Sequence, residues 1–289
     1  MELLRALGAL AEPPSTEHGR IARVLELPGT LEASAYSAVF DLELRPYASI
    51  YLGSDGLIGG EALDRIAGFW RALKWSPPPD ADHLGSLLGL YATLKDTETR
   101  ETDGARAALL RHSRAVLMGE HLLPWLFPYL GRVAEVADGV YRAWARLLDG
   151  VLRAELLEFG APDAVPRHLA LASPLPDPRR EGADAFVVGL LSPARSGMIL
   201  LHRDLARAAE HAGIGVRSGG RRMTLTALLS EAPKAAMEWL AEETRSRVPQ
   251  HEELLSGCGP IQEHWIDRGG AAAALLDDLA SRVGSGVLA

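Results

Sequence analysis

Apolar residues recur every three or four positions in the clearest segments of this chain, and that period constrains the fold more than any other feature. It runs through GGEALDRIAGFWRALKW (59–75), HLGSLLGLYATL (83–94) and GVYRAWARLLDGVLRAELLEF (139–159). A period near 3.6 residues places the apolar side chains on one face of a helix. Two short apolar stretches, ASIYLGS (48–54) and AFVVGLL (185–191), are too isolated to build a sheet and are interpreted as helix or extended connector. We therefore predict an all-α protein.

Proline, glycine and charged residues divide these helical segments. Breaks are predicted at SPPPD (76–80), at KDTETRETDG (95–104) and near Pro233, inside a long helical pattern. The richest break is SPLPDPRREGAD (173–184), with three prolines and paired arginines. It predicts a helical domain over residues 1–172, a linker over about 173–184, and a smaller, mainly helical C-terminal extension over residues 185–289.

The charge and hydropathy of the chain argue against two classes of partner. The formal net charge is −8, which disfavours general affinity for nucleic acid or for an anionic membrane. No run approaches the roughly 18 to 20 apolar residues that a membrane span needs. The opening MELLRALGALAEPP is too short and too interrupted for a signal peptide. We expect a cytoplasmic protein with no nucleic acid partner and no stable membrane association.

Motifs for metal, phosphate and catalytic chemistry are weak. Cys258 is the single cysteine, so neither an intramolecular disulfide nor a multi-cysteine metal site is possible. The nearest approach to a metal cluster is His251, Glu252, Cys258 and His264, but their spacing is loose. GIGVRSGG (213–220) lacks the glycine spacing of a phosphate loop and is interpreted as a turn. We expect no bound metal and no cofactor.

A DNA-binding regulator stays open as an alternative function. RDLARAAEHAGIGV (203–216) has the character of the second helix of a helix-turn-helix motif. Between Arg195 and Arg247 there are nine Arg or Lys residues and six Asp or Glu residues, a net of +3 in an otherwise acidic chain. No convincing first helix precedes this segment, which weighs against the motif.

The stretch SPPPDADHLGSLLGLYATL (76–94) sets three prolines, two aspartates and a histidine against an apolar helix. One interpretation is a plain helix start, with Asp80 or Asp82 as the N-cap. The other is a working surface, in which Asp82 and His83 form an exposed pair that a ligand reaches. A small-molecule enzyme using this pair as acid and base remains a further alternative.

Three blocks of the sequence, in a fixed order, resemble the TorD/DmsD/NarJ family of molybdoenzyme maturation chaperones. They are YSAVFDLELRPYASIYL (36–52) with the helical segment 59–75, then PPPDADHLGSLLGLYATL (77–94), then EHLLPWLFPYLGRV (120–133). The first block is most similar to the NarJ branch, the nitrate reductase assembly chaperones. The family pattern of Asp-His-Leu is matched by Asp82, His83 and Leu84, and His-Leu-x-x-Trp by His121, Leu122 and Trp125. The chain departs from the family where Pro79-Asp80 replaces the usual Glu-Pro.

The resemblance implies a helical bundle that is not an enzyme and carries no cofactor. Its implied partner is the apo catalytic subunit of a molybdopterin oxidoreductase, bound through an N-terminal leader that often carries twin arginines. The chaperone holds the client for cofactor insertion. The implied client-binding residues are Phe40, Asp41, Tyr51, Trp70, Asp82, His83, Leu84, Tyr91, His121 and Trp125.

Within that set, two kinds of role are expected. Tyr51, Trp70, Tyr91 and Trp125 are the expected lining of an apolar groove, and plain core packing is the alternative for each of them. Asp41 and Asp82 are the expected acceptors for arginines of the client, since carboxylates bind guanidinium groups through two hydrogen bonds.

Overall fold

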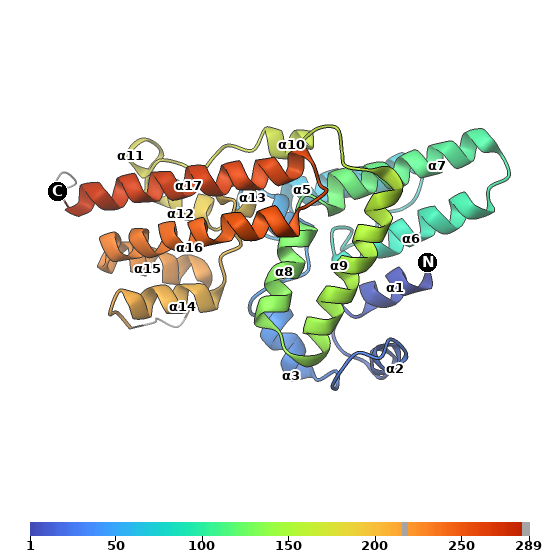
Figure 1. The fold of residues 1–289 in the computed structure, drawn as a ribbon, viewed down its shortest axis with the longest axis horizontal. Helices are drawn as coiled ribbons and strands as arrows, with labels where there is room; N and C mark the ends of the chain where they lie inside the picture. The colour runs from blue at the N-terminus through green and yellow to red at the C-terminus, as the bar shows by residue number, and fades with distance from the viewer. Residues whose placement is uncertain (216–218, 285–289) are drawn as a thin grey trace. The chain divides into compact units, whose positions relative to one another are not determined.

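The structure is a computed structural model that describes residues 1–215 and 219–284 (Figure 1). Within these residues the chain forms helices and no strand, apart from one isolated bridge between Tyr47 and His83. The predicted all-α fold is confirmed for the described part of the chain. None of the helices in that part is both long enough and apolar enough to cross a membrane.

The helices follow one another with short connections. In chain order they are α1 (Glu2–Ala9), α2 (Thr16–Val24), α3 (Ala33–Tyr36), the π-helical η1 (Ser37–Asp41), α4 (Ala48–Leu52), α5 (Gly60–Ala72), α6 (Leu84–Arg100), α7 (Gly104–Val116), the π-helical η2 (Leu117–Leu122), α8 (Leu126–Val136), α9 (Gly139–Phe159), α10 (Arg167–Ala170), α11 (Pro178–Glu181), α12 (Ala183–Leu190), α13 (Pro193–Ser196), α14 (His202–His211), α15 (Arg221–Glu231), α16 (Pro233–Leu254) and α17 (Pro260–Gly284).

The chain divides into two compact units. The first unit contains Met1–Ser49 and Leu57–Pro166, and the second contains Ile50–Gly56 and Arg167–Ala289. The segment predicted as a linker, residues 173–184, contains α11 and the first residues of α12. The division into a helical domain over residues 1–172, a linker over about 173–184 and a helical extension over residues 185–289 stays a prediction.

The core of the first unit forms where α1 packs against both α6 and α9. The indole Nε1 of Trp144 donates a hydrogen bond to the carbonyl of Leu7 at 2.8 Å, which fixes α9 on α1. Phe40 meets Tyr141 and Trp144 edge to face, with ring centroids 5.0 and 5.6 Å apart. These contacts bury the apolar stripes that the sequence predicts, so the stripes are the interior of this unit.

Helix α6 is longer than the sequence predicts. The break expected at 95–104 is wrong over its first part, because the helix continues to Arg100. The hydroxyls of Thr97 and Thr99 donate to carbonyls one turn earlier, so these polar residues are satisfied within the helix. The chain leaves the helix at Glu101, and Asp103 then caps α7 by accepting the backbone N–H of Ala105 at 2.8 Å.

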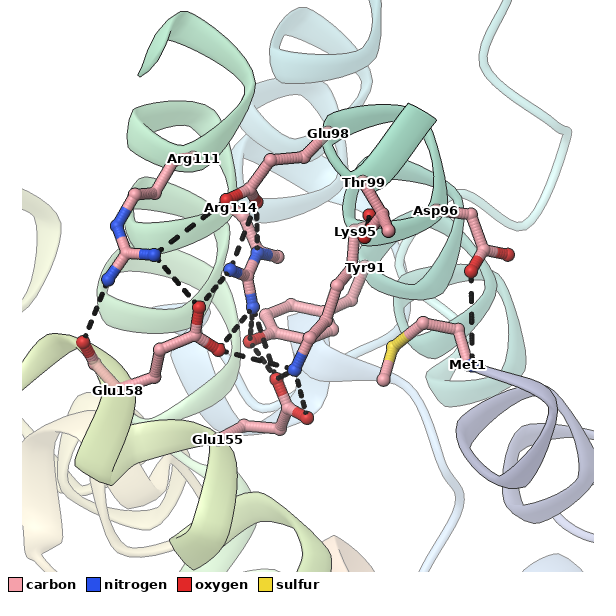
Figure 2. A network of polar contacts seen from close by, with 10 residues as sticks. All are labelled: Met1, Tyr91, Lys95, Asp96, Glu98, Thr99, Arg111, Arg114, Glu155 and Glu158. Carbon is pink, nitrogen blue, oxygen red and sulfur yellow. Dashed lines mark hydrogen bonds and ion pairs between the residues drawn. The ribbon is translucent and has the colours of Figure 1, made fainter. Parts of the chain in front are cut away.

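An ion network around Arg114 joins α6, α7 and α9 (Figure 2). Arg114 is 1% exposed, and its guanidinium stacks over the ring of Phe159. Its partners are the carboxylates of Glu98, Glu155 and Glu158 and the hydroxyl of Tyr91. Lys95 adds a second cation on Glu155, at 2.6 Å. A buried guanidinium with this many partners fixes the three helices at one point.

The second unit has a separate apolar core, built around α16 and α17, which lie side by side (Figure 1). The predicted break near Pro233 is confirmed: α15 ends at Glu231 and Pro233 is the first residue of α16. The turn predicted at GIGVRSGG (213–220) includes residues 216–218 and so lies outside the described residues.

Candidate functional site

Asp82 holds the start of α4. It is 1% exposed, and its Oδ2 atom accepts the backbone N–H of Ser49 at 3.2 Å. Its own backbone carbonyl accepts the N–H of Ala48 at 2.9 Å. The prediction that Asp80 or Asp82 caps the helix beginning at residue 84 is therefore wrong. Asp82 instead satisfies the first N–H groups of a helix 33 residues earlier in the chain.

His83 is the residue that caps α6. Its Nδ1 atom accepts the backbone N–H of Gly85 at 3.1 Å, and the ring also hydrogen-bonds the backbone of Ala11. Since Nδ1 is an acceptor, the ring proton lies on Nε2. Burial lowers the pKa of His83, and the nearby carboxylates of Glu12, Asp80 and Asp82 oppose that shift. The imidazole is neutral near neutral pH.

The Asp82–His83 pair is buried, so the prediction of an exposed pair is wrong. His83 is 8% exposed, and the backbone N–H of Leu84 donates to the carbonyl of Pro46 at 2.8 Å. This bond and the Tyr47–His83 bridge pull the end of the proline-rich loop against residues 46–49. Asp82 and His83 fix the backbone of the loop through hydrogen bonds, and they offer little exposed surface to a ligand.

The exposed groups of this region surround the pair. Tyr47 is half-buried, and its ring meets the ring of His83 edge to face at 5.0 Å. Glu12 and Asp80 are exposed, and both act on the pKa of His83. Burial raises the pKa of Tyr47, and the negative charges of Asp80 and Asp82 raise it further. We call Glu12, Tyr47, Asp80, Asp82 and His83 the acidic corner.

Glu12 and Tyr47 were not among the residues that the sequence singled out. Glu12 lies close to the first turn of α6, since a Cβ atom on Gly85 would sit 3.2 Å from its Oε1 atom. A carboxylate at that position is favoured by the positive end of the helix. Nothing local in the sequence relates Glu12 to residues 80–85. Tyr47 does lie inside the block 36–52, which was the available signal.

Asp41 is exposed at the end of η1, where its Oδ2 atom accepts the hydroxyl of Ser37 at 2.7 Å. The next residue, Leu42, is 64% exposed. Phe40, directly before Asp41, points into the core against Tyr141 and Trp144. Asp41 is thus open to solvent, as an acceptor for a client arginine must be.

Two of the four predicted groove aromatics, Tyr91 and Trp125, lie in the core of the first unit, as does the predicted client-binding residue Leu84. Leu84, Tyr91 and Trp125 have no exposed surface. The hydroxyl of Tyr91 donates to Glu155 at 2.9 Å, and the indole of Trp125 donates to the carbonyl of His121 at 2.8 Å. In this conformation these side chains support the interior, and their part in client binding stays a prediction.

His121 and Trp70 differ from these core residues, because His121 has a buried nitrogen without a hydrogen-bond partner and Trp70 is partly exposed. Burial lowers the pKa of His121 to about 4, helped by the charge of Arg65, and its Nδ1 atom is buried with no hydrogen-bond partner. The ring of Phe69 lies 5.2 Å from the imidazole. Trp70 is half-buried, and its ring lies 6.4 Å from the ring of Trp75 at a tilted angle of 58°. Among the four aromatics expected to line a groove, Trp70 alone has partly exposed surface.

Tyr51 lies in the second unit, whereas the other nine predicted residues lie in the first. It is 2% exposed, and burial raises its pKa while the charge of Arg221 acts against that shift. The structure therefore does not gather all ten residues in one compact unit.

The weak metal candidate of the sequence is not assembled in the described part of the chain. Within residues 1–215 and 219–284, no three His, Cys, Asp or Glu side chains come together in a way that could hold a metal ion. The Nε2 atom of His251 hydrogen-bonds the carbonyl of Gly197 at 2.9 Å, and Cys258 is buried. The expected absence of a bound metal stays a prediction.

Comparison with known proteins gives one finding that bears on function. A search of the curated proteins found no match. Residues 10–129 match the family described as nitrate reductase delta subunit. That range contains the acidic corner and all ten predicted client-binding residues. Over residues 10–129 the chain is thus similar to the nitrate reductase delta subunit family, which supports its resemblance to the NarJ/TorD type of chaperone.

Proposed function

We propose that this protein is a maturation chaperone for a molybdopterin-containing oxidoreductase. It binds the leader peptide or the apo form of the catalytic subunit in the cytoplasm and holds it for cofactor insertion and assembly. The observation that carries the proposal is the match of residues 10–129 to the nitrate reductase delta subunit family, a family of molybdoenzyme assembly chaperones. The proposed role is client binding and not catalysis.

The acidic corner is the proposed contact for basic residues of the client. Glu12 and Asp80 are exposed, and the charges of both carboxylates act on the half-buried Tyr47. A guanidinium group can contact both the carboxylates and the tyrosine ring, since it donates paired hydrogen bonds to carboxylates and stacks on aromatic faces. Asp82 and His83 contribute by fixing the loop that carries Asp80.

The apolar part of the client is proposed to contact Trp70 and Leu42. Trp70 is the partly exposed member of the predicted groove aromatics, and Leu42 stands 64% exposed beside Asp41. An exposed leucine next to an exposed carboxylate suits a segment that combines basic and hydrophobic residues. The net charge of −8 adds long-range attraction for such a segment.

The test is a calorimetric titration of the purified protein with a synthetic leader peptide. The peptide is the N-terminal leader of the catalytic subunit of a molybdopterin oxidoreductase. The double variant Glu12→Gln, Asp80→Asn removes both exposed carboxylates and should weaken binding at least about tenfold, because the loss of even one charge-assisted contact has that effect. Asp163→Asn, an exposed aspartate of the same unit, is the matched control and should bind as wild type does.

Two results would count against the proposal. Absence of any saturable binding by wild type would remove the leader-binding role. Equal weakening by the double variant and by Asp163→Asn would show that only net charge matters. Asp82→Asn separates positioning from contact, since Asn still offers an oxygen to the N–H of Ser49, and it should bind the peptide nearly as well as wild type.

A further inference from the structure

Two arginines of the second unit, Arg195 and Arg268, differ from most arginines in this protein. Many of the other guanidinium groups pair with carboxylates, as Arg179 does with Asp177 and Asp278. Within the described residues, Arg195 and Arg268 form no ion pair, and each has a backbone carbonyl as its hydrogen-bond partner. Two half-buried cations without a counter-charge are costly unless something else neutralises them.

The two guanidinium groups converge on one short stretch of backbone. Arg268, on α17, donates from Nη2 to the carbonyl of Ala172, and Arg195, on α13, donates from Nη2 to the carbonyl of Pro174. The two side chains therefore reach carbonyls only two residues apart in sequence. We call them the Arg195–Arg268 pair.

The backbones that carry the pair are in direct contact. Gly197 has a φ of +65°, and a Cβ atom there would lie 2.4 Å from the backbone nitrogen of Gly269. Only glycine permits so close an approach of α13 to α17. The carbonyl of Gly197 is also bonded to Nε2 of His251 at 2.9 Å. The pair is thus held on a tightly packed scaffold and needs little ordering to bind a ligand.

The pKa shift of Arg268 agrees with two neighbouring cations that have no ion-pair partner. Burial lowers the pKa of Arg268, and the charge of Arg195 lowers it further. His264 lies one turn before Arg268 on α17 and so shares its helix face. Burial lowers the pKa of His264 to about 4, and Arg268 adds to that shift while Asp267 opposes it. A neutral imidazole therefore stands near the Arg268 guanidinium.

Several donors of this cluster have no protein partner. The Nε atom of Arg195 and the Nε2 atom of His264 are buried without a hydrogen bond. The Nη1 atom of Arg195 and the Nε and Nη1 atoms of Arg268 are not among the buried atoms that lack a hydrogen-bond partner. Arginine offers five N–H donors, and each of these two arginines uses one of them in a hydrogen bond to a backbone carbonyl.

We propose that the Arg195–Arg268 pair binds a phosphate group, either as the free ion or as a phosphate monoester of a small molecule. A single guanidinium matches the two oxygens of a carboxylate, whereas two guanidinium groups from different helices match the several oxygens of a tetrahedral dianion. His264 supplies a further polar nitrogen on the same side. The bound dianion neutralises both cations, which nothing else in the described residues does.

The test uses the full-length protein and NMR of the arginine Nε–Hε groups during titration with inorganic phosphate. Signals of Arg195 and Arg268 should shift saturably, with a dissociation constant of about 1 mM or lower. Arg195→Gln and Arg268→Gln should each weaken binding about tenfold, the loss of one charge-assisted contact. Arg180→Gln, an exposed arginine of the same unit with no ion pair, is the matched control and should bind as wild type does.

A second titration, with glycerol phosphate, distinguishes the sources of the group. Tighter binding than inorganic phosphate indicates an organic phosphate, and equal binding indicates the free ion. Lack of a saturable shift in wild type overturns the proposal, and so does unchanged affinity in both glutamine variants. If these variants fail to fold, the wild-type signals still decide, because shifts confined to arginines other than Arg195 and Arg268 would contradict the assignment.

Discussion

The Nδ1 atom of His83 accepts the backbone N–H of Gly85 at 3.1 Å, so a histidine is the N-cap of α6. Replacing His83 with Ala removes the acceptor and should lower the free energy of unfolding by about 1 kcal/mol. His83→Asn restores a capping oxygen but loses the bond to Ala11, so its loss should be smaller. Urea denaturation of both variants measures this, and equal losses would contradict the capping role.

The crossing of α1 and α6 leaves no room for a side chain at Gly85. A Cβ atom there would lie 3.1 Å from the carbonyl oxygen of Gly8, which belongs to a helix backbone and cannot move easily. Gly85→Ala should therefore destabilise the protein by about 1 to 3 kcal/mol. Gly89→Ala, on the same helix with open space around it, should stabilise it by up to about 1 kcal/mol. Thermal melts should show opposite shifts, and a shift of the same sign in both would refute the crossing.

Arg114 is the buried hub of the ion network in the first unit. Arg114→Met would leave Glu98, Glu155 and Glu158 facing only Lys95 and Arg111, and it should cost about 3 to 5 kcal/mol. The comparison variant is Arg20→Met, which breaks an exposed pair with Glu17 and should cost less than about 1 kcal/mol. Similar unfolding free energies for the two variants would show that the network is not a structural anchor.

His121 makes stability depend on pH. Its pKa is about 4 in the folded protein and 6.5 when exposed, so the unfolded chain binds the proton first as pH falls. Stability from the neutral imidazole is complete above pH 6.5 and is lost between pH 6.5 and about 4. By pH 4 the loss is on the order of 3 kcal/mol.

The variant His121→Leu cannot be protonated and should lack this component of the pH dependence. Unfolding by urea at several pH values, wild type against variant, isolates the effect from other titrating groups. His112→Gln, at an exposed histidine of α7, is the control and should follow wild type. A difference between wild type and His121→Leu that stays constant with pH would contradict the buried neutral state.

Several long helices of this fold were predictable because each of them carries its own periodic stripe. Ile66, Leu88 and Trp144 all lie on buried faces where the three-and-four spacing places them. Pro233 was equally informative, since a proline is tolerated in the first turn of a helix and ends whatever precedes it. Such signals are local, so a single sequence contains them in full.

The candidate site was less predictable because its decisive contacts are between distant residues. Asp82 caps a helix that begins at Ala48, and no pattern within residues 76–94 reveals that partner. His83 takes the cap position that a sequence-based assignment gives to an aspartate, since histidine is not among the preferred capping residues. Glu12 follows α1 and lies near the same region, although helices α2 to α5 separate it in sequence from Asp82 and His83.

Residues 50–56 belong to the second unit although the chain on either side belongs to the first. The carbonyl of Gly53 accepts the hydroxyl of Ser192, a residue 139 positions later. During synthesis this short segment leaves the ribosome long before the partner that satisfies it. The second unit is therefore completed late in translation, and cutting the gene at a linker near residue 172 would separate this segment from the chain that covers it.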